Sequence, residues 1–207
     1  MKLYWFDTVN PRKVCAVAKY LESPVEYTRV NLGRGEHKTP EYVAINPNGK
    51  VPTLVDGARV LWEAAAIMCH LAARADSELW PQDHRQIDVL RWLSWDLAHF
   101  YRAGGTLYFE HIIKLRFGLG ETDPVAVGKA TDEWRRLAAI LDTYLHDRRW
   151  LVGNSVTIAD FAVAAFLPYA ERTHIPVNEF PAIRRWHDGL NEIDAWRDPF
   201  PEPAMAA

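Results

Sequence analysis

The chain has 207 residues, of which 49% are hydrophobic and 25% are charged, a composition typical of globular proteins and unlike disordered or collagen-like chains. Its 24 Lys and Arg residues and 27 Asp and Glu residues give a formal net charge of −3, so we expect neither a nucleic-acid partner nor an anionic membrane partner. Cys15 and Cys69 form no disulfide framework or zinc motif, and the sequence shows neither a signal-peptide pattern nor a long apolar stretch. These features predict a cytoplasmic protein without a bound metal or a membrane segment.

The first third of the chain alternates strand patterns with helix patterns. Leu3–Phe6 is a short apolar run typical of a buried strand, and the following apolar residues, up to Leu21, have the i, i+3, i+4, i+7 spacing of an amphipathic helix. Val25–Val30 is rich in β-branched and aromatic residues, which predicts a second strand. Thr39 followed by Pro40 predicts the start of a short second helix, because Thr is a good N-cap and Pro is favoured at the first helical position.

Two further strands and a helix are predicted before residue 76. Val51–Val55 and Ala58–Trp62 flank Asp56-Gly57, a dipeptide suited to a two-residue hairpin. From Glu63 the apolar spacing is again that of a helix. The predicted order is therefore βαβαββα, an α+β domain in which helices pack on a small sheet, and we assign it to residues 1–76.

The rest of the chain has the spacing of helices. Ser77 and Trp80-Pro81 break the pattern and predict a linker, after which the second domain, residues 84–207, is predicted to be all helical. The helical series are Leu90, Leu93 and Leu97; Leu137, Ile140, Leu141 and Tyr144; and Ile183, Trp186, His187 and Leu190. Thr157 and Asp160 have the spacing of a capping box, and Phe161–Leu167 is apolar on all sides, which predicts a central buried helix.

Three segments together resemble the glutathione S-transferase superfamily. They are Asn46-Pro47-Asn48-Gly49-Lys50-Val51-Pro52-Thr53-Leu54, the helix start Trp62-Glu63-Ala64-Ala65-Ala66-Ile67, and the capped helix at Thr157–Asp160. Members join a thioredoxin-like N-terminal domain to an all-helical C-terminal domain, so the resemblance implies this fold, glutathione as co-substrate and a homodimer. The first turn, Thr8–Val14, with Leu32–Glu36, is similar to bacterial members of the Nu type and their theta-like relatives.

The resemblance implies that Thr8 and Asn10 activate the thiol of glutathione. A thiol attacks as its thiolate, and a free thiol with a pKa of about 8.5 is mostly protonated at neutral pH. Between the first strand and the first helix, a hydroxyl, a side-chain amide and the positive end of the helix could stabilise the sulfur anion. The alternative from the residues alone is that Thr8 or Asn10 merely caps the helix.

The resemblance also implies which residues bind the rest of glutathione. Val51-Pro52 is expected to be a cis bond, which lets the backbone of Val51 bind glutathione like an added strand. The helix start at Glu63 and Ala64 is a ready site for the γ-glutamyl group, although members commonly have Ser where this chain has Ala64. Lys50 and His37 are expected near the glycyl end, but His37 could equally be a solvated loop histidine.

The acceptor substrate is expected to bind in a pocket between the domains that the helical domain forms, next to Phe6. Trp92, Trp95, Asp96 and His99 are predicted to share a helical face, and we assign acceptor binding to Phe6, Trp95 and His99. Aromatic residues at helical spacing can instead belong to the core or to a dimer surface.

The leading hypothesis is a glutathione S-transferase whose bound thiolate attacks the electrophilic carbon of a small hydrophobic compound or a disulfide. Nu-like members are associated with disulfide reduction by glutathione, and theta-like members with conjugation. The alternative is a non-catalytic binding or regulatory protein of the same fold, which Ala64 and His37 favour. Isomerase or dehalogenase chemistry is disfavoured, because the Ser-rich first turn of the maleylacetoacetate isomerase relatives is absent. Both cysteines are interpreted as structural.

Overall fold

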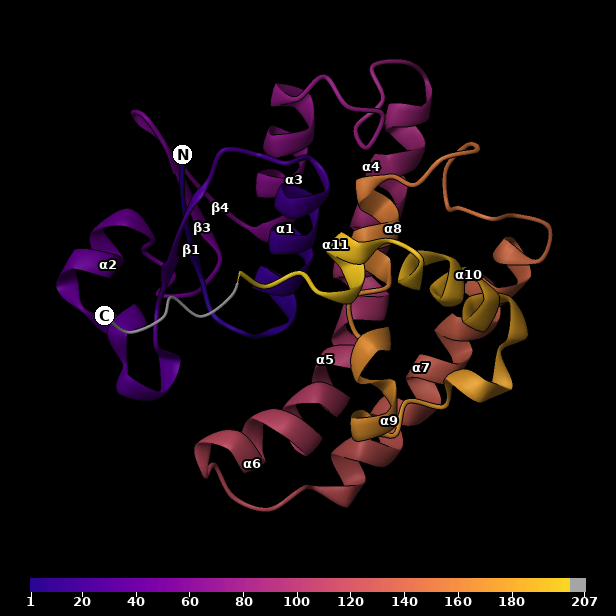
Figure 1. The fold of residues 1–207 in the computed structure, drawn as a ribbon. Coiled ribbons are helices and arrows are strands. Elements are labelled where there is room, and N and C mark those ends of the chain that lie inside the picture. Colours follow the sequence, from indigo (N-terminus) through magenta and orange to yellow (C-terminus); the bar gives the residue numbers. More distant parts are fainter. Residues whose placement is uncertain (202–207) are drawn as a thin grey trace. The chain divides into compact units, whose positions relative to one another are not determined.

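The computed structural model describes residues 1–201 and divides the chain into two compact units (Figure 1). Unit 1 comprises Met1–Ser77 together with residues 193–201, and unit 2 comprises Glu78–Glu192. The first boundary therefore lies in the segment that the sequence predicts as a linker.

Unit 1 is built around a four-stranded mixed sheet with the predicted element order βαβαββα. Its elements are β1 (Lys2–Trp5), α1 (Val9–Tyr20), β2 (Glu26–Arg29), the 3₁₀ turns η1 (Leu32–Arg34) and η2 (Glu36–Lys38), α2 (Pro40–Ile45), β3 (Thr53–Asp56), β4 (Arg59–Trp62) and α3 (Ala64–Arg74). The strands lie in the order β2-β1-β3-β4; β1 pairs in parallel with β2 and antiparallel with β3, and β3 and β4 form the predicted hairpin. The predicted α+β fold class is confirmed.

The core of unit 1 lies between the sheet and two helices. Leu3 of β1 pairs with Leu54 of β3, and both side chains are fully buried. The helices α1 and α3 pack against each other and bury Val14, Ile67 and Met68. These residues belong to the apolar faces that the sequence pattern predicts, and their burial stabilises the two helices far more than intrinsic helix propensity does.

The end of the described chain belongs to unit 1, so the predicted helical domain at residues 84–207 is too long. The short helix α11 (Asp194–Arg197) packs against α1, beside which Figure 1 draws it. The physical reason is that Trp196 is fully buried and its carbonyl oxygen accepts a hydrogen bond from the Arg12 guanidinium. Residues 202–207 of that prediction lie outside the described residues.

Unit 2 is all helical, as predicted. Its elements are α4 (Arg85–Trp95), η3 (Asp96–Phe100), α5 (Tyr101–Tyr108), η4 (Phe109–Ile113), α6 (Lys114–Phe117), α7 (Pro124–Leu145), α8 (Ile158–Val163), η5 (Leu167–Tyr169), α9 (Ala170–Thr173), η6 (Val177–Glu179) and α10 (Pro181–Asn191). The segments η3 and η4 are π-helical, so α4, α5 and α6 form one continuous helical stretch with two wider turns. In residues 1–201, no helix combines the length and apolar character needed to cross a membrane.

The predicted capping box at the start of α8 is confirmed. Asp160 is fully buried, and its carboxylate accepts hydrogen bonds from the backbone amide and hydroxyl of Thr157, from the amide of Leu151 and from the indole of Trp186. All residues in Phe161–Leu167 are buried, as expected. However, α8 ends at Val163 rather than at Leu167, because the following amides bond three residues back instead of four: Ala165 to Ala162 and Leu167 to Ala164.

Candidate functional site

The turn between β1 and α1 holds Thr8 and Asn10. Thr8 is the N-cap of α1 with extended backbone angles, but its side chain makes no capping hydrogen bond. A capping side chain bonds to the amide of the second or third helical residue, and the third residue here is Pro11, which has no amide hydrogen. Helix capping therefore does not occupy the half-buried Thr8 hydroxyl.

The electrostatics of this turn favour an anion at the start of α1. The first turn of α1 contains no acidic residue, so no side-chain carboxylate within it offsets the positive end of the helix dipole. The nearest acid in sequence, Asp7, pairs with Arg29 at 3.5 Å. The guanidinium of Arg29 also lies over the ring of Phe6, 4.7 Å from its centroid, and Phe6 is buried. Phe6 is thus part of the packing of unit 1.

The Val51-Pro52 bond is cis, as expected, and buried hydrogen bonds hold the chain on both sides of it. Asn46 donates its side-chain amide to the carbonyl oxygen of Lys50 at 2.7 Å and to the hydroxyl of Thr53 at 2.9 Å. The hydroxyl of Tyr42 donates to the same carbonyl at 2.7 Å. Asn46 and Thr53 are almost completely buried, so these hydrogen bonds fix the Lys50–Thr53 backbone.

The structure brings the His37 segment against the turn before Lys50. Gly49 has a φ of +56°, and a Cβ there would lie 3.1 Å from the carbonyl oxygen of His37, so only glycine suits both the backbone angle and the close approach. Burial, aided by the charge of Lys38, lowers the pKa of His37, which keeps the imidazole neutral at pH 7. Its Nδ1 is buried without a hydrogen-bond partner in the described part of the chain. The side chain of Lys50 is exposed.

The start of α3 presents backbone amides in a strained turn. Glu63 is the N-cap, with a φ of +72°, a conformation that costs a residue other than glycine on the order of 1–3 kcal/mol and is found mainly at functional sites. The first intrahelical bond runs from the amide of Ile67 to the carbonyl of Glu63, so the amides of Ala64, Ala65 and Ala66 precede it. Ala64 is buried and offers no hydroxyl. These amides and the helix dipole suit a carboxylate.

The predicted acceptor residues are divided between the units, and the four residues from Trp92 to His99 do not share one face. Trp92 and Asp96 are buried, Trp95 is half-buried and His99 is exposed. The reason is the π-helical turn η3, which widens the helix and rotates the residues in it. Trp95 stacks on Phe100 and meets Trp92 edge to face, each at 5.2 Å between ring centroids, as expected for an aromatic core cluster.

His99 lines a pocket of about 460 Å³ that sequence reasoning did not predict. Arg102, Lys129 and Glu133 also line this pocket, which lies between α5 and α7. Glu133 is held by two hydrogen bonds from Arg136 and contributes a negative charge to the pocket wall. His99 is therefore available to solvent on unit 2.

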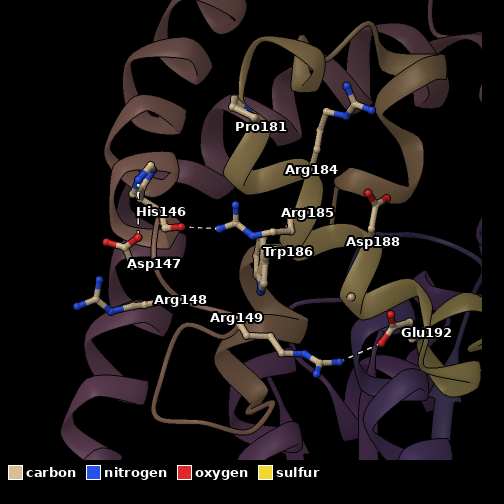
Figure 2. A pocket seen from close by; sticks show the side chains of 11 residues that line it. His146, Asp147, Arg148, Arg149, Pro181, Arg184, Arg185, Trp186, Asp188 and Glu192 are labelled. Carbon is tan, nitrogen blue, oxygen red and sulfur yellow. Dashed lines mark hydrogen bonds and ion pairs between the residues drawn. The ribbon is translucent and has the colours of Figure 1, made fainter.

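A second pocket, of about 740 Å³, lies in unit 2 between the end of α7 and α10 (Figure 2). Four arginines line it, and three of them, Arg148, Arg149 and Arg185, bond to groups of the protein itself. Arg185 donates to the carbonyl oxygens of Leu145 and His146 and thereby caps the C-terminal end of α7. Arg149 points to Glu192, with which it forms an ion pair at 3.0 Å. No predicted site residue lies here.

Neither cysteine has the properties of a nucleophile. Burial raises the pKa of Cys15 to about 12 and that of Cys69 to about 11, so both thiols are protonated at neutral pH. Both are free, and Cys15 is fully buried. Among residues 1–201, no group of three or more His, Cys, Asp or Glu side chains is placed to hold a metal ion.

Sequence reasoning missed the buried cluster of Tyr42, Asn46 and Thr53. Its signal in the sequence is the Asn46-Pro47-Asn48-Gly49 motif, which contributes to the family resemblance but does not itself indicate these buried hydrogen bonds. An Asn side chain can bond to a nearby backbone and also to a distant side chain, and only the fold shows that Asn46 bonds to Thr53 and that Thr53 in turn bonds to Tyr42.

Comparison with known proteins gives consistent results over nearly the whole chain. Residues 1–73 match the model of the glutathione S-transferase N-terminal domain, and residues 104–194 match that of the C-terminal domain. The chain is 28% identical to the disulfide-bond oxidoreductase YfcG of Escherichia coli K12, covering 93% of this chain and 91% of that protein. It is 29% identical to glutathione S-transferase 1 of Schizosaccharomyces pombe, covering 95% and 93%.

A solved structure of a glutathione transferase from Burkholderia graminis has the same fold. It superimposes with a TM-score of 0.85 at 24% sequence identity and covers 99% of this chain and 89% of that one. That protein holds two glutathione molecules per subunit.

Proposed function

This chain belongs to the glutathione S-transferase superfamily, and from that premise we propose that it is a glutathione transferase in which Thr8 and Asn10 stabilise the glutathione thiolate. The observation that carries the proposal is the state of Thr8: it stands at the positive end of α1, and its hydroxyl makes no capping bond. A hydrogen bond to a charged group contributes about 1.5–3 kcal/mol, or roughly one to two units of thiol pKa. One or two donors are therefore enough to make a thiolate the main species at neutral pH.

The remaining predicted residues bind the other parts of glutathione in this proposal. The backbone of Val51, next to the cis Pro52, bonds to the cysteinyl unit of glutathione. The amides that begin α3 at Ala64 receive the γ-glutamyl carboxylate, and Glu63 accepts the amino group. The hydrogen bonds of Asn46 support this arrangement, because they fix the backbone just before Val51.

The glycyl carboxylate of glutathione is proposed to lie near Lys50 and His37. Lys50 supplies the charge, and its exposed side chain makes no ion pair within residues 1–201. His37 supplies a hydrogen bond rather than a charge, because its lowered pKa keeps it neutral. The buried Nδ1 of His37 without a partner supports a ligand contact over a purely solvated histidine.

The reaction proposed is direct attack by bound glutathione on a disulfide or on an electrophilic carbon. Attack on a disulfide forms a bond between the glutathione sulfur and one substrate sulfur, and the other substrate sulfur leaves as a thiolate. The raised pKa values of Cys15 and Cys69 favour this route over one through a protein thiol. The similarity to a protein named disulfide-bond oxidoreductase supports the disulfide as acceptor.

We also propose that the protein is a homodimer in the cytoplasm. Ile87, Leu90 and Leu97 are all exposed along α4 and η3, with exposed fractions of 68%, 42% and 52%. Such a row of exposed apolar residues is typical of a surface that a second copy covers. Light scattering coupled to gel filtration measures the mass in solution; a monomer at micromolar concentration would contradict the dimer.

The core of the proposal is tested by titrating bound glutathione, following thiolate absorbance in the ultraviolet against pH. We expect the pKa of the bound thiol to lie at least one unit below the free value of about 8.5. A bound pKa equal to the free value removes thiol activation. The alternative, a non-catalytic binding protein, predicts retention on immobilised glutathione without turnover of an electrophile or a disulfide.

A further inference from the structure

The last described segment of the chain, Ile193–Pro201, lies against β1 and α1, and we call it the C-terminal clamp. Its contact with β1 is an aromatic stack: the rings of Phe200 and Trp5 have centroids 5.3 Å apart and planes inclined by 22°. Trp5 is the last residue of β1 and stands three positions before Thr8. The clamp therefore holds the strand where the chain enters the turn that carries Thr8.

The contact of the C-terminal clamp with α1 is made through Arg12. The guanidinium of Arg12 donates to the carbonyl oxygen of Trp196 at 2.5 Å and lies over the indole of the same residue, 5.2 Å from the ring centroid. Arg12 and Trp196 are both buried. The backbone amide of Arg12 donates to the carbonyl oxygen of Thr8 at 3.0 Å, so Arg12 is directly bonded to the first turn of α1.

A third contact, between Lys19 and Asp198, is weaker. The ammonium of Lys19 donates to the carbonyl oxygen of Asp198 at 2.6 Å and to its carboxylate at 3.0 Å. Both side chains are largely exposed, and exposed ion pairs contribute little to stability. The buried Arg12 contact and the Phe200 stack therefore carry most of the attachment.

We propose that the C-terminal clamp is a positioning element for the thiolate site, fixing the direction of the Thr8 hydroxyl and of the first amides of α1. The inference rests on the proposed function, because the direction of the hydroxyl matters only if Thr8 donates to the sulfur. The positioning role is inferred because the C-terminal clamp contacts the chain on both sides of Thr8, at Trp5 and at Arg12. The strength of a hydrogen bond depends steeply on angle and distance, so a loosened turn stabilises an anion less well.

Phe200→Ala tests the clamp, because Phe200 is only half-buried and its removal spares the Arg12 contact. Phe180→Ala is the matched control: Phe180 is also half-buried, and it contacts Trp134 of unit 2 edge to face. Phe200→Leu keeps an apolar side chain and should behave nearly as the wild type.

The first measurement is hydrogen exchange of the Arg12 amide, which needs no glutathione. We expect exchange on the order of five- to tenfold faster in Phe200→Ala than in the wild type and in Phe180→Ala, because the turn opens more often. Equal exchange rates in Phe200→Ala and the wild type would overturn the clamp, whatever the function of the protein.

The second measurement is the pH profile of the glutathione transfer rate. We expect Phe200→Ala to lose about three- to tenfold in rate at pH 6.5 and to recover by pH 9, where the thiol ionises without help. Faster exchange with an unchanged pH profile, or an equal loss at both pH values, would overturn the positioning role. If wild-type protein leaves the bound thiol unionised, the proposed function fails, and the exchange measurement still decides whether the clamp fixes the turn.

Discussion

Asn46 donates its side-chain amide to the hydroxyl of Thr53 at 2.9 Å, and both residues are almost completely buried. Because the same amide donates to the carbonyl of Lys50, Asn46→Ala leaves two buried oxygens with fewer donors. We expect this variant to lower the free energy of unfolding by about 1–3 kcal/mol and to weaken glutathione binding. Urea unfolding and calorimetry measure the two effects. Asn178→Ala, at an exposed position of unit 2, is the control, and an equal loss in both variants would contradict the prediction.

Thr8→Ala and Asn10→Ala remove the proposed donors to the sulfur. We expect each to raise the pKa of the bound thiol by roughly one to two units, because a hydrogen bond to the thiolate is lost. Ultraviolet titration of bound glutathione gives this value directly. The matched control is Thr106→Ala in unit 2, where the hydroxyl donates to the carbonyl of Arg102 within α5. Full turnover in a double variant that carries both Thr8→Ala and Asn10→Ala would contradict the proposed mechanism.

Ala64→Ser supplies the hydroxyl that the resemblance leads one to expect at the start of α3. Ser is close to Ala in size, so the buried position should accept it, and a new hydrogen bond to the γ-glutamyl carboxylate should tighten glutathione binding. We expect the dissociation constant to fall roughly three- to tenfold, equivalent to about one net hydrogen bond. Ala73→Ser, exposed near the end of the same helix, should leave the constant unchanged. Equal constants for Ala64→Ser and the wild type would place the carboxylate elsewhere.

Asp56 gives unit 1 a pH-dependent contribution to stability. Hydrogen bonds from His70 at 3.0 Å and Arg74 at 3.1 Å hold the pKa of Asp56 below its usual value. A carboxylate whose pKa is lower in the folded state stabilises the fold above its unfolded pKa of about 4, and this stabilisation disappears as the pH falls through the folded pKa.

We therefore expect Asp56→Asn to be less stable than the wild type at pH 7, with the difference shrinking as the pH falls below about 4. Urea unfolding at a series of pH values measures it. Asp132→Asn, at a highly exposed carboxylate in unit 2, should show almost no difference at any pH. A difference for Asp56→Asn that stays constant from pH 7 to pH 2 would contradict the role of its charge.

The sequence predicted the elements that depend on local patterns. The apolar run Leu3–Phe6 and the hairpin dipeptide Asp56-Gly57 are local signals, and the structure confirms the strands that they predict. The capping box at Asp160 is also local, yet its bonds to Leu151 and Trp186 come from distant segments that a pattern does not reveal. In the site, the left-handed backbone of Glu63 was not predicted, because nothing in the residue type indicates it.

The errors have a common physical origin in tertiary packing. The π-helical turn at Asp96–Phe100 changes the spacing of one helix by a fraction of a turn, which is enough to expose His99 beside buried Asp96. Trp196 belongs to unit 1 because it contacts Arg12 of α1, a residue more than 180 positions earlier in the chain. Periodicity describes which face of a helix is apolar, but it does not identify the segment that covers that face.

The burial of Trp196 against α1 has a consequence for the order of events during synthesis. Residues 1–77 leave the ribosome long before residues 193–201, and N-terminal domains generally begin to fold while the rest of the chain is still being made. A nascent chain that stops short of Trp196 lacks the carbonyl oxygen that accepts a hydrogen bond from the Arg12 guanidinium, and it leaves part of α1 uncovered. The segment 193–201 must therefore leave the ribosome before the first unit can complete its own core.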